Sequence, residues 1–125
     1  MEAKKKLSIS DLIANADKIK AKKAETRELY VKSLDATVTI TKPSRELVLD
    51  FYEMGEGEGN PFLVYECVAE PNFKDTNLQA TFEVTGYEVL DKIFDLGEVD
   101  AIAKEIVGFA GYGTNSVSIV EDVKN

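Results

Sequence analysis

The sequence predicts an α+β fold: a mainly helical single domain of about five to six helices with one small antiparallel β-hairpin. Apolar residues recur at helical spacing along most of the chain, whereas β-branched and aromatic residues concentrate in two short neighbouring segments. The length of 125 residues suits one domain, so we expect residues 1–125 to share one core.

The first expected element is a basic N-terminal helix within residues 1–28. Ser8 or Ser10 can cap it, and Asp11 is placed to close a capping box from Ser8. A narrow apolar stripe follows, made of Ile9, Leu12, Ile13, Ala16 and Ile19. Beyond Ile19 the chain is helix-prone but polar. We therefore expect this helix to project from the body of the protein, or to dock only through its first turns.

The segments 29–31 and 37–40 predict the β-hairpin, with residues 33–36 as the connection. Because a lone hairpin is marginally stable in water, one of its faces should lie on the helices or on another subunit. The next helix should have Thr41 as its cap and Pro43 in its first turn, and should run to about Met54. Its expected inner face consists of Leu47, Val48 and Phe51.

A glycine-rich stretch at 55–61 is expected to be a mobile surface loop. Its glycines alternate as those of a phosphate-binding loop do. However, Glu56 and Glu58 would repel phosphate, and no lysine with a serine or threonine completes that motif. We therefore do not predict a phosphate-binding site at residues 55–61.

Residues 62–68 fit either a strand or a helix. Their β-branched and aromatic content suits a strand, but Pro61 is a good helix start and Pro71 a good helix end, so we favour the helix. After this segment, Asp75 or Thr76 can cap a further short helix.

Residues 85–112 predict a pair of helices at the centre of the core. Thr85 is the expected cap of the first helix, and residues 95–97 leave room only for a tight corner between the two. The expected inner faces are Val89, Leu90, Ile93 and Phe94 in the first helix, and Val99, Ile102, Ala103, Ile106, Val107 and Ala110 in the second. Gly111 and Gly113 supply the stop signal.

The net charge of −8 is unevenly distributed along the chain. Up to Lys32 there are nine basic and five acidic residues, a net +4, whereas from Ser33 onward six basic residues face eighteen acidic ones, a net −12. A basic arm on an acidic body could bind nucleic acid at one end and a basic partner at the other, but solvated helix faces are the simpler explanation. The basic run 18–27 has no interleaved aromatic residues and no base-reading motif, which argues against nucleic acid.

The residues that usually carry catalysis or bind metals are scarce. The chain has no histidine, and its single cysteine, Cys67, lies in an apolar run typical of a core. Glu66 with Glu70, and Asp91 with Asp95, are each four apart and would share a helix face, but no third oxygen ligand accompanies either pair. We therefore predict no catalytic, cofactor-binding or metal-binding residues, and a binding or assembly role rather than an enzyme. Without an apolar run long enough for a membrane span, or a signal segment, we expect a cytoplasmic protein.

Several segments match a known family in their combined order from about Ser8 to Asn125. These segments are Leu29-Tyr30-Val31 with Thr39-Ile40-Thr41-Lys42-Pro43, Leu63-Val64-Tyr65-Glu66-Cys67-Val68 running into Glu70-Pro71-Asn72, Asp91-Lys92-Ile93-Phe94, Gly97-Glu98-Val99, Ile102-Ala103-Lys104-Glu105 and Ala110-Gly111-Tyr112-Gly113. In them the chain resembles the XkdN-like tail assembly chaperones of tailed phages and phage-derived elements in Gram-positive bacteria. The matches are of core and turn type and include no catalytic signature.

The resemblance implies a non-enzymatic role in tail morphogenesis. Such chaperones bind the tape-measure protein, keep it soluble, help tail-tube subunits polymerise around it, and are absent from the finished particle. Acidic faces on a helical domain suit amphipathic helices as partners. The alternative is a nucleic-acid-associated regulator or adaptor that uses the basic N-terminal helix. The sequence leaves the oligomeric state open.

The end of the chain carries two further expectations. The tail 114–125 has an apolar patch at Val117, Ile119 and Val120, and could add a strand edge or stay flexible. The resemblance also implies, as a third partner beside the tape-measure and tail-tube proteins, a longer form of this chain made by ribosomal frameshifting. Val123-Lys124-Asn125 permits a slippery codon run GUA-AAA-AAU or GUA-AAA-AAC, although an ordinary charged C-terminus fits the same residues.

Overall fold

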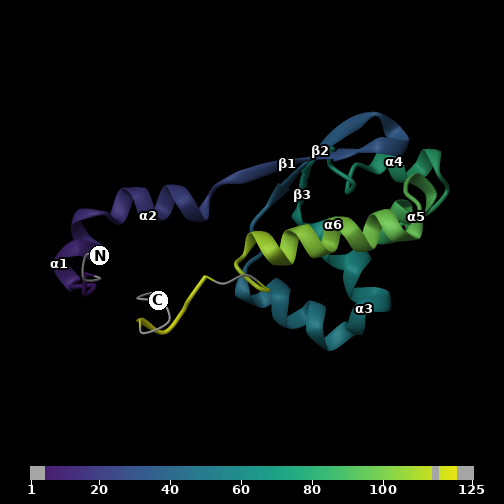
Figure 1. The fold of residues 1–125 in the computed structure, drawn as a ribbon. Helices are drawn as coiled ribbons and strands as arrows, with labels where there is room; N and C mark the ends of the chain where they lie inside the picture. The colour runs from purple at the N-terminus through teal and green to yellow at the C-terminus, as the bar shows by residue number, and fades with distance from the viewer. Residues whose placement is uncertain (1–4, 114–115, 121–125) are drawn as a thin grey trace.

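The computed structural model describes residues 5–113 and 116–120. Its elements are α1 (Ile9–Ala14), α2 (Ala16–Lys23), β1 (Thr26–Val31), the 3₁₀ turn η1 (Lys32–Leu34), β2 (Ala36–Thr41), α3 (Arg45–Cys67), β3 (Val68–Glu70), α4 (Thr76–Thr81), the 3₁₀ turn η2 (Gly86–Glu88), α5 (Val89–Ile93) and α6 (Leu96–Phe109). With the two halves of the bent α3 counted separately, the described residues form seven α-helices, slightly more than predicted. The predicted mainly helical α+β fold is confirmed (Figure 1). The predictions for residues 114–115 and 121–125, including those for Asn125, lie outside the described residues.

The sheet has three antiparallel strands in the order β1-β2-β3. The predicted hairpin is confirmed, with β1 and β2 in register from Thr26 opposite Thr41 to Val31 opposite Ala36. The third strand was not predicted. It pairs with β2 through Glu70 opposite Thr39, and its three residues are too few to show a period of two.

The start of α3 differs from the prediction that Thr41 caps it. The cap is Ser44, whose Oγ accepts a hydrogen bond from the backbone N–H of Leu47 at 3.2 Å. Pro43 disfavours helical backbone in the residue before it, so Lys42 is a poor first residue for a helix capped by Thr41. The Thr41 hydroxyl instead donates to the carbonyl oxygen of Cys67 (3.2 Å), which ties β2 to the end of α3.

The prediction of a mobile loop at 55–61 was wrong. Only Gly55 leaves helical geometry, with φ 78° and ψ 164°, and the chain then resumes the helix through Pro61 to Cys67. Gly59 is buried where the two halves of α3 approach each other: a Cβ there would lie 2.6 Å from the backbone oxygen of Phe51. Glycine is therefore required here by close packing. The helical reading of residues 62–67 is confirmed, and Val68 already belongs to β3.

The core is built around α6, which packs along α3 (Figure 1). The buried face of α6 consists of Val99, Ile102, Ala103, Ile106 and Phe109. The predicted stripe is therefore correct through Val107, which is partly buried against the core, but Ala110 is exposed and Phe109 takes the last inward position. Val31, Val38, Ile40, Leu63, Val64, Phe73, Val89, Leu90 and Phe94 complete most of the same cluster.

Two predicted caps near this core have different outcomes. Asp75 caps α4 as predicted, accepting from the backbone N–H of Leu78 at 2.9 Å. Thr85 was predicted to cap a helix directly, but it precedes η2 and makes no side-chain cap bond, and α5 begins only at Val89. Gly86 has φ 65°, which lies outside helical geometry, so an α-helix cannot begin directly after Thr85.

Residues 5–25, called the arm below, lead away from residues 26–113, called the body (Figure 1). One helix was expected here, but α1 and α2 are separate and residues 26–28 belong to β1. The break falls at Asn15, whose side-chain amide donates to the carbonyl oxygen of Asp11 at 2.8 Å and so competes with the helix. Neither helix contains a buried residue. Among the described helices, none combines the length and hydrophobicity needed to cross a membrane.

Candidate protein-binding surface

The arm presents an apolar stripe to solvent. It consists of Leu7, Ile9, Leu12, Ile13 and Ile19, and is called the arm stripe below. Ile9 and Ile13 are each 72% exposed, although the sequence spaces them as a buried helix face would be spaced. The helix is secured locally instead, because Ser8 Oγ accepts from the backbone N–H of Asp11 at 3.1 Å. Hydrogen bonding of the Asp11 carboxylate with Ser8, and then with Lys5, lowers the pKa of Asp11.

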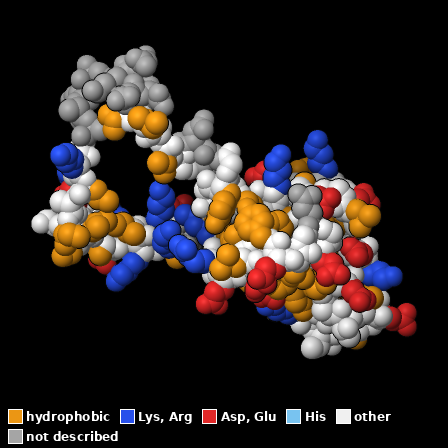
Figure 2. All heavy atoms as spheres, turned by 90° about the horizontal axis from the view of Figure 1, so that it is seen from below, with side chains coloured by type: hydrophobic (Ala, Val, Ile, Leu, Met, Phe, Trp, Pro, Cys, Tyr) orange, Lys and Arg blue, Asp and Glu red, His pale blue; other side chains and the backbone are white. Residues whose placement is uncertain are grey.

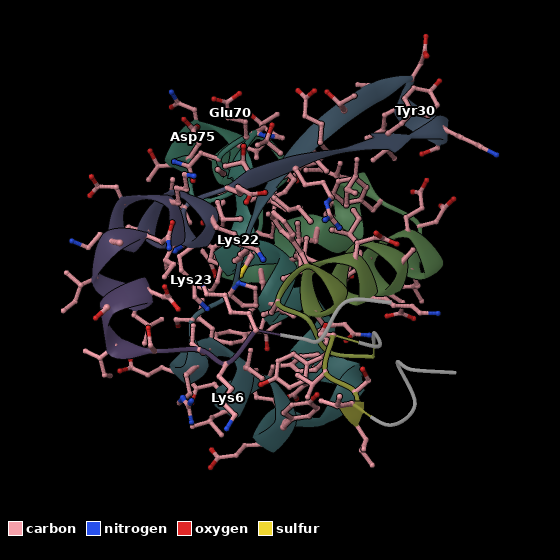
Figure 3. The ribbon with its side chains drawn as sticks, turned by 60° about the vertical axis from the view of Figure 1, so that its left-hand side comes forward. Lys6, Lys22, Lys23, Tyr30, Glu70 and Asp75 are labelled. Atoms are coloured by element: carbon pink, nitrogen blue, oxygen red, sulfur yellow. The ribbon has the colours of Figure 1, made fainter. Side chains whose placement is uncertain are left out.

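A groove of about 1120 Å³ lies where the arm joins the body, and is called the junction groove below. Its described lining includes one carboxylate, Glu25, against five cations: Lys22, Lys23, Arg27, Lys42 and Arg45. Lys and Arg side chains gather visibly at this junction in Figure 2. Figure 3 places Lys22 and Lys23 on α2 beside the body, and Tyr30 at the far end of the hairpin. Positive charge is thus concentrated on a protein whose net charge is −8.

An aromatic ring holds two of these cations in place. The guanidinium of Arg27 lies 4.2 Å from the centre of the Phe109 ring, and Lys42 Nζ lies 5.1 Å from it. Such cation–π contacts are favourable by about 0.5–2 kcal/mol each. Lys42 Nζ also donates to the carbonyl oxygen of Lys22 at 2.6 Å, which links the body to the end of α2. The side chains of Arg27 and Lys42 are therefore already held in position in the unbound protein.

Apolar side chains continue the same surface towards α6. Leu49, Tyr52 and Tyr112 line the junction groove and are exposed. The ring of Tyr52 packs at 5.2 Å from Phe51 and edge-on at 6.3 Å from Tyr112. Hydrophobic side chains are visible on this underside of the body in Figure 2. Half-exposed aromatic rings beside cations are typical of a binding surface.

A second hollow of about 780 Å³ adjoins the junction groove between α3 and α6. The two hollows share Arg27, Tyr52, Gly108 and Tyr112. The second one also carries carboxylates, because Asp100 and Glu105 line it together with Lys104. Asn60 Nδ2 donates to Asp100 Oδ1 at 2.9 Å, which fixes this wall to the second half of α3. The charge along the combined surface therefore changes from basic to mixed.

The residues considered above as candidates for catalysis or metal binding do not come together in a shared site. Cys67 is buried, and this burial raises the pKa of its thiol to about 11. The prediction that Glu66 and Glu70 share a helix face was wrong, because α3 ends at Cys67 and Glu70 lies in β3. Glu66 instead pairs with Lys74 Nζ at 2.8 Å, and this hydrogen bond raises the pKa of Lys74. Within residues 5–113 and 116–120, no three potential metal ligands form a group.

Asp91 and Asp95 are likewise separated by the end of a helix. Asp91 lies in α5, whereas Asp95 is the residue before α6. The backbone N–H of Asp95 donates to Glu98 Oε1 at 2.8 Å, so the acidic residues here serve the start of the helix. The expected shared face was therefore wrong for this pair also.

Sequence reasoning found the arm stripe but missed the junction groove. Arg27, Lys42 and Phe109 are far apart in the chain, and no local pattern joins them. A weak signal was present in Leu49 and Tyr52, which are apolar, three residues apart, and off the inner face formed by Leu47, Val48 and Phe51.

An exposed apolar helix face beside a charged, aromatic groove is typical of a domain that binds other proteins. A family model described as phage XkdN-like tail assembly chaperone protein matches residues 50–124 of the chain. This span is more than half of the chain. The protein therefore belongs to the XkdN-like tail assembly chaperone family. No curated protein and no solved structure matched the chain. The arm and the hairpin strands β1 and β2 precede the matched span.

Proposed function

We propose that this protein binds the tape-measure protein during phage tail assembly, keeps it soluble and assists polymerisation of the tail tube around it. The family supports a role in tail assembly through protein–protein interaction. A tape-measure protein is a long helical chain, and its apolar stripes need transient cover until the tube encloses them. A small domain that offers an apolar helix face meets that need.

The observation that carries this proposal is the exposure of the arm stripe. Ile9 and Ile13 are helically spaced yet 72% exposed, and neither α1 nor α2 buries a residue. Amphipathic helices associate through such stripes, because each covers the apolar surface of the other. The arm stripe is therefore the proposed contact for an apolar stripe of the tape-measure protein.

The proposed role is non-enzymatic and is carried out in the host cytoplasm. The chaperone is released before the phage particle is complete. The tail-tube protein and a longer, frameshifted form of this chain are further proposed partners. Neither role requires a cofactor.

Co-expression of the full chain with the tape-measure protein encoded beside it tests the proposal. We expect the wild-type chain to raise the soluble fraction of the tape-measure protein and to co-purify with it. Ile13→Ser should weaken this binding by about tenfold, because it removes apolar area from the contact.

Leu96→Ser is the matched control, because Leu96 on α6 is 71% exposed and Ile13 is 72% exposed. The control should bind as the wild type does. A tape-measure protein that remains insoluble beside the wild-type chain would contradict the proposed function. Equal binding by Ile13→Ser and the wild type would contradict the role of the arm stripe.

A further inference from the structure

We propose that the junction groove is a docking site for an amphipathic protein helix that carries carboxylates beside its apolar stripe. Lys22, Lys23, Arg27, Lys42 and Arg45 would receive the carboxylates, and Leu49, Tyr52 and Tyr112 the apolar side chains. The inference rests on the proposed function in that it takes the partner to be a protein, and it adds the place and the charge of the partner's segment.

The distribution of charge is the first argument for an acidic partner. From Ser33 onward the chain has a net charge of −12, so most of the body repels an acidic segment. The described lining of the junction groove is instead positively charged, because it contains five cations and one carboxylate. An acidic segment approaching the protein is therefore attracted to this groove and not to the rest of the body.

Preorganisation of the groove is the second argument. Arg27 and Lys42 are held over the Phe109 ring at 4.2 Å and 5.1 Å, and Lys42 is also bonded to the backbone of α2. These side chains lose less conformational freedom on binding than unrestrained lysines would. Lys23 and Arg45 are exposed and line the groove from two different helices, Lys23 on α2 and Arg45 at the start of α3.

The apolar part of the lining points to a helix and not to a diffuse acidic segment. Leu49 and Tyr52 are one helical turn apart on α3, and Tyr112 packs edge-on against Tyr52 at 6.3 Å. Together they form an apolar strip next to the cations. An amphipathic helix places apolar and charged side chains along adjacent faces in the same way, so both parts of the groove are filled at once.

Nucleic acid is the competing ligand for a groove of cations and tyrosines. A phosphate backbone needs a continuous basic track. Here the surface becomes mixed beyond Tyr52 and Tyr112, where Asp100 and Glu105 line the adjoining hollow. A protein helix can carry carboxylates at one end alone, whereas a nucleic acid carries phosphate along its whole length. The lining therefore favours the protein helix.

The test measures binding of three fluorescent probes to the full chain by anisotropy. The first is a helical peptide of about 20 residues built from alanine, leucine and glutamate, with the leucines on one face. The second has lysine in place of glutamate, and the third is a single-stranded oligonucleotide. We expect the glutamate peptide to bind at least about tenfold more tightly than the lysine peptide, with an affinity that falls as salt rises.

Charge reversal in the groove has a matched control on α2. Lys23→Glu with Arg45→Glu should weaken binding of the glutamate peptide by about tenfold or more. Lys18→Glu with Lys20→Glu makes the same change in net charge at exposed positions of α2 that do not line the groove, and should weaken it by less than about threefold. Equal losses in the two double variants would overturn the proposal, because the attraction would then be a general one.

The apolar strip is tested by Tyr52→Ala, with Tyr30→Ala as its control. Tyr52 is 57% exposed and Tyr30 59% exposed, and Tyr30 lies at the far end of the hairpin (Figure 3). Only Tyr52→Ala should weaken peptide binding, by about tenfold. Circular dichroism melting curves should show every variant folded, since each altered side chain is exposed. Only Tyr52→Ala, which loses ring contacts with Phe51 and Tyr112, and Tyr30→Ala, which loses a hydrogen bond to Asp35, should melt slightly earlier than the wild type.

Three other outcomes would overturn the inference. One is an oligonucleotide that binds more tightly than the glutamate peptide and depends on Lys23 and Arg45. Another is a wild-type dimer that Lys23→Glu with Arg45→Glu converts to a monomer, because a second copy would then occupy the groove. The third is tape-measure binding that is unchanged in this double variant. That result would be compatible with the proposed function but would show that the junction groove does not bind the tape-measure protein. Peptide binding without tape-measure binding would instead support the groove and contradict the proposed function.

Discussion

The helix α6 and the arm carry apolar stripes of the same kind, but only α6 buries its stripe. Ile106 in α6 is fully buried, whereas Ile13 in the arm is 72% exposed. The difference arises from what lies opposite each helix. α6 packs along α3 and the core cluster, while the arm precedes the sheet and leads away from it (Figure 1). Helical spacing alone therefore predicts an amphipathic helix, but not whether its partner is the same chain or another one.

The apolar residues of the two regions therefore differ in their contribution to stability. Those that form the core of the body are buried and stabilise the fold, whereas those of the arm stripe are exposed to solvent. The arm and the body meet at the junction groove, where Lys42 of the body donates a hydrogen bond to the carbonyl oxygen of Lys22 in the arm. Substitutions in the arm should accordingly leave the stability of the body almost unchanged.

Truncation of one isoleucine in each region gives the largest expected contrast. Ile106→Ala should lower the free energy of unfolding by about 2–5 kcal/mol, because it removes fully buried methyl and methylene groups and leaves a cavity. Ile13→Ala should change it by less than about 0.5 kcal/mol, since the side chain contributes little to the core. Urea denaturation followed by circular dichroism measures both values. A loss of more than about 1 kcal/mol for Ile13→Ala would mean that the arm stripe is covered in the free protein.

Two glycines of α3 give the next largest contrast. Gly59→Ala would place a Cβ 2.6 Å from the backbone oxygen of Phe51, so the two halves of α3 must move apart. We expect a loss of about 1–3 kcal/mol in the free energy of unfolding. Gly57→Ala meets no atom within 4 Å and lies in helical backbone, so it should stabilise the protein by about 0.4–1 kcal/mol. The same denaturation curves measure both.

This pair also decides between the two descriptions of residues 55–61. If the segment were the mobile loop that its composition predicts, both substitutions would have nearly equal and small effects. Opposite signs for Gly59→Ala and Gly57→Ala are expected only from a close-packed helix.

The glycine segment and the junction groove show where sequence reasoning reached its limit. Periodicity recovered α6, and the concentration of β-branched and aromatic residues recovered the β1–β2 hairpin, because both signals are local in the sequence. Sequence reasoning failed at Gly59, because the need for glycine there comes from Phe51, eight residues away and across a bend. It failed at the junction groove because Arg27 and Phe109 meet only through the tertiary fold. Contacts of this kind leave no trace in the spacing of neighbouring residues.

The smallest expected effect concerns how the β1–β2 hairpin, the element nearest the arm, is fixed to α6. Ser33 Oγ donates to Glu98 Oε2 at 2.6 Å, and this hydrogen bond is the main cause of the lowered pKa of Glu98. Ser33→Ala should therefore raise the pKa of Glu98 towards its ordinary value of 4.5, without reaching it, because the backbone N–H of Asp95 still donates to the carboxylate. Titration of the Glu98 carboxyl group by NMR measures the shift.

The same bond predicts the sign of a pH effect on stability. The pKa of Glu98 is lower in the folded protein than in the unfolded chain, so its contribution is present above pH 4.5 and is lost as the pH falls through the folded value. The wild type should exceed Ser33→Ala in stability at neutral pH, and the two should converge in acid. Ser10→Ala, in the arm, should leave the pKa of Glu98 unchanged. An unchanged pKa in Ser33→Ala would instead mean that this hydrogen bond does not form, and that it does not fix the hairpin to α6.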